Sequence, residues 1–182
     1  MSELEGRVEL IPMQCVRCQQ PLAAQPDEVV WVCSNCGQGQ ILSDEKGLLP
    51  QTVHYAAGIP ANMSGKPVWV AAGQVTLHRE TYKGNNQQDM EQFWSHPRWF
   101  FIPAYSLALE QLASTGVSLL KQPIPMQEVQ TRSPFLPVTI LPEDIRSLAE
   151  FILLSVEAER KDQLRSLTYD LQLGSPDLWI FP

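Results

Sequence analysis

Two cysteine pairs determine the fold of the first part of the chain. They are Cys15-Val-Arg-Cys18 and, after fourteen further residues, Cys33-Ser-Asn-Cys36-Gly37. Two residues between paired cysteines allow both sulfurs of one tight turn to reach a single ion, at about 2.3 Å for zinc. Residues 28–33 favour a strand and 40–42 offer its partner, so a hairpin would bring the second pair opposite the first. The spacing therefore predicts one structural zinc ion per chain, with Cys15, Cys18, Cys33 and Cys36 as its ligands.

The bulk composition is that of a globular protein. Of the 182 residues, 44% are hydrophobic and 18% are charged, which is too apolar for a disordered chain. No apolar run approaches the roughly 18 residues needed to span a bilayer, so we expect no membrane segment. The first residues are acidic and lack the apolar core of a signal peptide, which predicts a cytoplasmic protein. In a reducing compartment, paired cysteines favour metal binding over disulfides.

The charge of the chain indicates which class of partner it binds. The net charge is -7, and both parts are acidic: residues 1–47 hold three basic and seven acidic side chains, and the remainder holds ten and thirteen. Zinc with four thiolates adds a further formal charge of about -2 to the first part. Because nucleic-acid affinity comes largely from Lys and Arg neutralising phosphates, we expect a protein partner and not a nucleic acid.

Changes in composition along the chain predict three regions. Residues 1–47 form the cysteine module. Residues 48–66 are interpreted as a linker or an extended crossing segment, because glycines and prolines stand there among small side chains. Residues 67–182 are predicted to form an α+β domain with an antiparallel sheet and about two helices.

The strands of this second domain are expected from runs of strand-forming residues. Residues 68–78 form one such run, and 167–173 alternate apolar and polar side chains. The turn at 174–176 is predicted to close a hairpin with 178–181. The polar segment 83–91 is predicted to be a loop.

Two helices are predicted from apolar spacing and from the residues that begin and end helices. One covers 106–115, with Gly116 in the position that commonly follows a helix C-terminus. The other begins at Pro142, which suits the first helical turn, and extends to about residue 164.

The most unusual segment outside the cysteine module is aromatic and surrounds Arg98. One interpretation is a buried core, because aromatic side chains bury a large area. A second is an exposed patch that docks a protein partner, since Trp, Tyr and Arg are common interface anchors. A third is a stacking platform for single-stranded nucleic acid, although few Lys and Arg residues lie nearby. The candidate partner-binding residues are Trp94, Arg98, Trp99 and Tyr105.

The cysteine pattern resembles that of the zinc-ribbon (rubredoxin-like) fold group over residues 12–47. Gly37 follows the second pair, where the turn often needs a positive φ, whereas Gln19 follows the first pair and predicts a less regular turn. The resemblance implies metal binding, and members of the group serve in transcription, translation, replication and adaptor roles. Iron is the main alternative to zinc, because four thiolates suit both metals. A catalytic zinc is not expected, since four protein thiolates leave no open position for water.

No catalytic motif is evident in the sequence. The histidines are His54, His78 and His96, and none is spaced to share a helix face with another. We therefore predict a non-enzymatic adaptor or assembly protein that acts through protein–protein contacts. The alternatives are a nucleic-acid-associated zinc-ribbon factor and an enzyme whose site lies in the α+β domain, with His78 or His96 and carboxylates converging in three dimensions.

Overall fold

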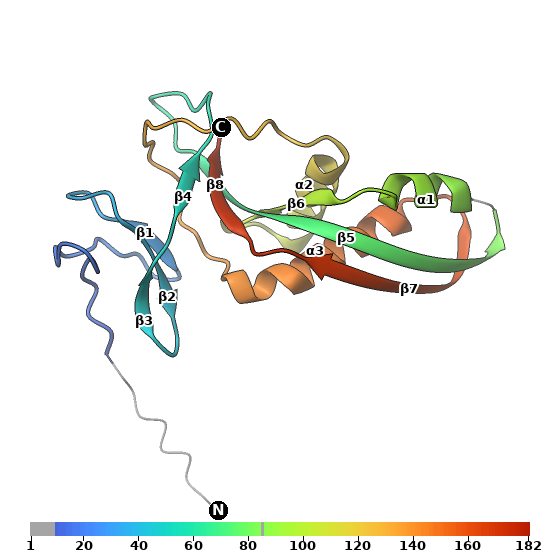
Figure 1. The fold of residues 1–182 in the computed structure, drawn as a ribbon, viewed down its shortest axis with the longest axis horizontal. Helices are drawn as coiled ribbons and strands as arrows, with labels where there is room; N and C mark the ends of the chain where they lie inside the picture. Colours follow the sequence, from blue (N-terminus) through green and yellow to red (C-terminus); the bar gives the residue numbers. More distant parts are fainter. Residues whose placement is uncertain (1–9, 85) are drawn as a thin grey trace, which may run out of the picture. The chain divides into compact units, whose positions relative to one another are not determined.

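The computed structural model describes residues 10–84 and 86–182, and the parts of the predictions that fall on residues 1–9 and 85 lie outside them. The chain divides into two compact units at Thr52/Val53 (Figure 1). The sequence placed the second domain at residue 67, so this division assigns the segment 48–66 differently. Part of it belongs to the first unit and part to the second.

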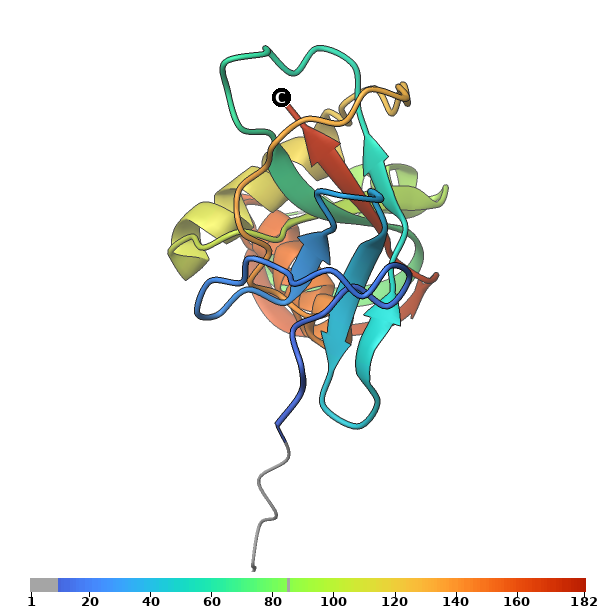
Figure 2. The same cartoon turned by 90° about the vertical axis from the view of Figure 1, so that its left-hand side faces the viewer.

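The first unit is built on a three-stranded antiparallel sheet in the order β1-β2-β3. Its strands are β1 (Val30–Val32), β2 (Gly39–Ser43) and β3 (Gly47–Pro50). The predicted hairpin is present, with Val30 opposite Ile41. The third strand was not predicted. Its last three residues come from the interpreted linker, and its first residue, Gly47, takes a positive φ of 72° at the end of the turn after β2. The hairpin of β2 and β3 can be followed in Figure 2.

The second unit contains a five-stranded, mainly antiparallel sheet, so the predicted α+β class is confirmed. The strand order is β4-β8-β5-β6, and β7 also pairs with β5. Its strands are β4 (Val53–Tyr55), β5 (Lys66–Lys83), β6 (Arg98–Pro103), β7 (Gln163–Leu173) and β8 (Asp177–Phe181). β4 runs parallel to β8, so the middle of the interpreted linker belongs to this sheet.

β7 and β8 do not form the predicted hairpin. Both pair with β5, β8 with its first part and β7 with its second, so Val70 lies opposite Asp177 and Gly73 opposite Leu173. β7 and β8 together act as one long partner strand for the 18-residue β5, with a break at residues 174–176. The turn residues predicted a reversal of the chain, but the length of β5 provides a continuous template for both strands.

Three α-helices, α1 (Gln87–Trp94), α2 (Leu109–Lys121) and α3 (Ile145–Ala158), are present in the described residues, and a single 3-10 turn, Pro142–Asp144, precedes α3. α1 replaces most of the predicted loop 83–91. α3 begins near the predicted position but ends earlier than residue 164. None of these helices has the length and apolar character needed to cross a membrane.

Gly116 is inside α2 and is not its cap. An added Cβ there would lie 2.3 Å from Cδ1 of Ile152 in α3, so glycine permits the close approach of the two helices. The prediction was wrong because the usual role of a glycine after a helix was preferred to a packing role.

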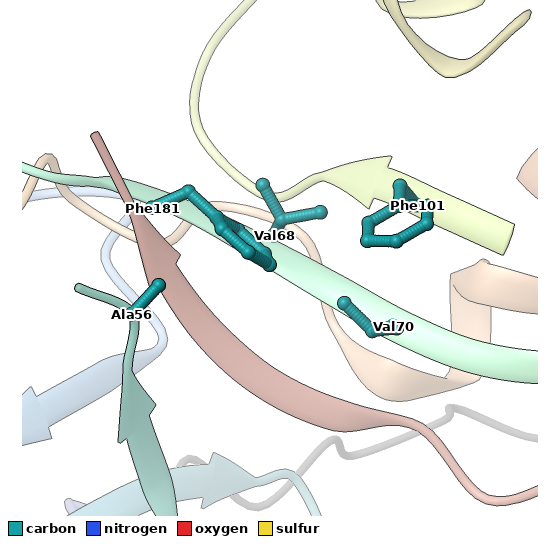
Figure 3. Close-up of a cluster of buried hydrophobic side chains, with 5 residues drawn as sticks. All are labelled: Ala56, Val68, Val70, Phe101 and Phe181. Atoms are coloured by element: carbon teal, nitrogen blue, oxygen red, sulfur yellow. The ribbon is translucent and has the colours of Figure 1, made fainter. Parts of the chain in front are cut away.

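The core of the second unit lies between the sheet and the segments that cover it. One buried cluster gathers side chains from β5, β6 and β8 together with the residue after β4: Ala56, Val68, Val70, Phe101 and Phe181 (Figure 3). Leu119, Ile124 and Met126 pack against this cluster. α2 packs on β6 and on α3.

The second half of β5 has one packed face and one exposed face. From Gly73 to Arg79 every second residue is buried, and the residues between are exposed or partly exposed. This alternation is the period-two pattern of a sheet with one face toward a core. Trp99, which pairs with the exposed Ala72, lies on this exposed face.

Candidate metal centre and interaction surfaces

The two cysteine turns have the same backbone geometry. In the first, the Gln19 amide donates to the Cys15 carbonyl over 2.8 Å, and in the second, the Gly37 amide donates to the Cys33 carbonyl over 2.8 Å. Gln19 and Gly37 both have a positive φ, 61° and 70°. The predicted irregularity of the first turn is therefore not observed: Gln19 takes the left-handed conformation that glycine adopts with less strain.

The four sulfurs converge on one point. The distance between Sγ atoms is 3.6 Å for Cys15 and Cys36 and 3.6 Å for Cys18 and Cys33, and all four lie within 4.8 Å of one another. A tetrahedron with metal–sulfur bonds of about 2.3 Å has edges of about 3.8 Å. The donor set therefore fits a tetrahedral metal ion.

The surroundings of the thiols favour thiolate formation at two of them. Burial raises the pKa of Cys15, but hydrogen bonds from backbone amides and neighbouring thiols outweigh it and lower that pKa to about 6. The Asn35 side chain lowers the pKa of Cys18, to which it donates over 3.5 Å. The Gln38 amide lowers the pKa of Cys36, but burial and the other thiols raise it to about 11. A bound metal ion needs all four as thiolates.

Gln40 connects the first cysteine turn to the sheet through a hydrogen bond. It is fully buried in β2, and its Oε1 accepts a hydrogen bond of 2.8 Å from the Val16 amide. Sequence reasoning missed this residue. The available signal was a long polar side chain directly before two apolar residues, Ile41 and Leu42, of a short strand.

Trp94 does not provide a docking surface. It is 4% exposed, and its Nε1 donates over 2.9 Å to Oε1 of Glu157, which is also buried. The core interpretation therefore holds for this residue. Tyr105 is partly buried, and burial raises the pKa of its hydroxyl.

Arg98 and Trp99 lie on opposite faces of the sheet. Arg98 stacks 3.6 Å above the Phe93 ring, on the α1 side of β6. Trp99 is 44% exposed and pairs with Ala72, which is exposed on the other face. Successive side chains of a strand point in opposite directions, so the predicted single patch is divided into two separate surfaces.

A buried ionic cluster connects α1, β5 and the end of α3, and sequence reasoning missed it. Arg79 contacts Asp162 at 2.8 Å and Glu157 at 3.6 Å, and Arg160 contacts Glu157 at 2.9 Å. Trp94 donates to the same Glu157 carboxylate. Two cations and two anions balance within the cluster. No local pattern could reveal it, because Arg79 and Glu157 are 78 positions apart.

The three histidines do not converge. His54 contacts Glu128 at 2.8 Å and stacks on Trp179, His78 lies on the exposed face of β5, and His96 lies in the turn before β6. Over residues 10–84 and 86–182, the only group of three or more metal-ligating side chains is the four-cysteine group.

Comparison with family models, with curated proteins and with solved structures gave no match to this chain. Fold and site together define the class of the protein. It is a mixed α+β protein that carries a four-cysteine site able to hold a metal ion.

Proposed function

We propose that this is a non-enzymatic, cytoplasmic adaptor or assembly protein that docks a protein partner through the exposed sheet face around Trp99. Its N-terminal unit is proposed to be a zinc ribbon. The proposal rests on one observation: the Trp99 indole is 44% exposed beside the second half of β5, where the other face of the sheet is packed. Tryptophan is one of the residue types, with Tyr and Arg, that are enriched among interface anchors.

Zinc is proposed as the metal because a closed set of four thiolates is typical of structural zinc sites. With all four positions filled by the protein, the ion would stabilise the N-terminal unit. Metal analysis of the purified protein should find one zinc per chain. Iron at that stoichiometry would contradict the assignment, because the same thiolates suit iron.

A protein partner is proposed in preference to a nucleic acid because the chain carries a net charge of -7. Without a basic surplus, binding to phosphates lacks its usual electrostatic drive. Any binding to DNA or RNA should therefore disappear at physiological salt.

The deciding experiment compares Trp99→Ala with Leu109→Ala, a control at another exposed apolar residue. Both variants should keep the wild-type melting temperature. Proteins captured from lysate by the wild type should be lost with Trp99→Ala and kept with Leu109→Ala. A truncated anchor commonly costs about 2 kcal/mol or more of binding free energy. Equal capture by both variants, or tight salt-resistant nucleic-acid binding, would overturn the proposal.

A further inference from the structure

The region around Arg98 contains an open hollow of about 460 Å³. It is formed by α1, from its first turn onward, and by the short connection to β6, which follow one another along the chain (Figure 1). Its lining consists of Asp89, Gln92, Phe93, Ser95, His96 and Arg98. The hollow lies on the α1 side of β6, so it is separate from the Trp99 face.

The guanidinium of Arg98 is held before any ligand arrives. Its Cζ lies over the Phe93 ring, 3.6 Å from the ring centroid, and its Nε donates over 2.7 Å to the Phe93 carbonyl. Among the described residues, the only hydrogen bond of the Arg98 side chain is the one from Nε, and no ion pair or hydrogen bond engages its two terminal nitrogens. A fixed guanidinium with both terminal N–H groups available matches the two oxygens of one carboxylate.

We propose that Arg98 binds a single carboxylate, supplied by a Glu or Asp side chain of the protein partner. This inference rests on the proposed adaptor function and adds the chemistry of a second contact. Stacking on Phe93 and the bond from Nε restrict the side chain in advance, so less conformational entropy is lost on binding.

The charges facing Arg98 favour a carboxylate over a phosphate. Asp89 is exposed and lines the same hollow, and no ion pair joins it to Arg98 within 4.0 Å. Its negative charge opposes a phosphate dianion more strongly than a carboxylate with one charge. His96 is the other titratable group in the lining, and it is exposed.

The test is an NMR titration of the full chain with acetyl-Gly-Glu-Gly-amide, with its Gln analogue and with inorganic phosphate. We expect the Glu peptide to shift the Arg98 Nε–H signal and the backbone amides of 92–98 saturably. The Gln analogue should bind at least about tenfold more weakly, because it lacks the charge that strengthens the hydrogen bonds. Phosphate should also bind more weakly than the Glu peptide.

Two variants and a control separate this site from general charge effects. Arg98→Lys keeps the charge but loses the paired N–H groups, and should weaken the Glu peptide about tenfold. Asp89→Asn, on the exposed side of α1, should tighten it about two- to fivefold by removing repulsion. Arg132→Lys changes an exposed arginine elsewhere and should have no effect.

The proposal is overturned if the Glu and Gln peptides bind equally, if Arg98→Lys binds as wild type, or if Asp89→Asn brings no gain. Absence of a saturable shift overturns it as well. Tighter binding of phosphate would identify a different ligand class and would also overturn it. None of these outcomes bears on the Trp99 capture experiment, so failure of this site and failure of the adaptor function are distinguishable.

Discussion

The two units differ in how many apolar side chains they bury. In residues 10–52 the buried apolar side chains other than cysteine are Val30, Trp31 and Ile41. In Val53–Pro182, each of the five strands and each of the three α-helices described for this unit contributes buried apolar residues. Domains near 40 residues rarely bury enough apolar surface to fold alone and usually need a metal or disulfides. The comparison shows why a four-cysteine site is found in the small unit.

The largest expected effect follows from removing the metal. Structural zinc in finger peptides contributes about 10 to 16 kcal/mol of apparent binding free energy, so chelation or Cys15→Ser should unfold residues 10–52. The larger unit should remain folded, because its core lies elsewhere. Hydrogen exchange measured along the whole chain checks this, with loss of protection confined to the first unit.

A fragment of residues 53–182 is the control for that experiment. It should be soluble and should unfold cooperatively with the same midpoint as the second unit of the intact protein. Loss of structure in both units on chelation would show that they fold as one, and the contrast drawn here would fail.

The next effect concerns the second unit alone. Glu157→Ala leaves Arg79 and Arg160 without their shared partner inside the protein, and breaking a buried ion pair in this way costs about 3 to 5 kcal/mol. Urea unfolding of the fragment 53–182 measures the loss.

Glu159→Ala is the matched control for that variant. Glu159 pairs with Lys121, and both side chains are substantially exposed. Exposed ion pairs contribute about 0 to 1 kcal/mol, so the control should unfold near the wild-type midpoint. Similar losses for the two variants would mean that the cluster around Glu157 does not stabilise the fold.

A smaller effect is expected at the contact between α2 and α3. Gly116→Ala gains about 1 kcal/mol of helix propensity but forces a methyl group against Ile152, and overpacking costs about 1 to 3 kcal/mol. We expect a net destabilisation in urea, since Ile152 is fully buried and has no room to move.

Ile152→Val provides a partial rescue. It removes Cδ1, which would lie 2.3 Å from the new Cβ, but keeps Cγ1, which would lie 2.7 Å from it. The double variant should therefore be more stable than Gly116→Ala alone but less stable than the wild type. Ser118→Ala, exposed on α2, should change stability by less than about 0.5 kcal/mol. An unchanged or raised midpoint for Gly116→Ala would show that the helices can separate easily.

The smallest expected change in stability comes from the residue with positive φ in each cysteine turn. Gln19→Gly relieves a left-handed conformation and should stabilise the metal-bound first unit by about 1 kcal/mol. Gly37→Gln introduces the same strain in the second turn and should destabilise it by a similar amount. Competition with a chelator followed by thermal unfolding measures both, and equal effects of the same sign would contradict the shared geometry.

Short-range features of the chain were enough to predict the four-cysteine group and part of the fold. The cysteine spacing identified all four side chains that come together, because a turn with two intervening residues fixes where its sulfurs point. The strands Val30–Val32 and Gly39–Ser43 and the start of the last helix followed from local patterns. Even the division of Arg98 from Trp99 was available in principle, since strand alternation places neighbours on opposite faces.

Tertiary structure decided the features that depend on residues far apart in the chain. Glu157 became the partner of Trp94 and Arg79, Ile152 determined the role of Gly116, and the length of β5 determined where β7 and β8 pair. Each depends on which distant surfaces meet, and that is settled by packing the whole unit. A local pattern records the preferences of neighbouring residues, whereas the free energy of a buried contact belongs to both partners at once.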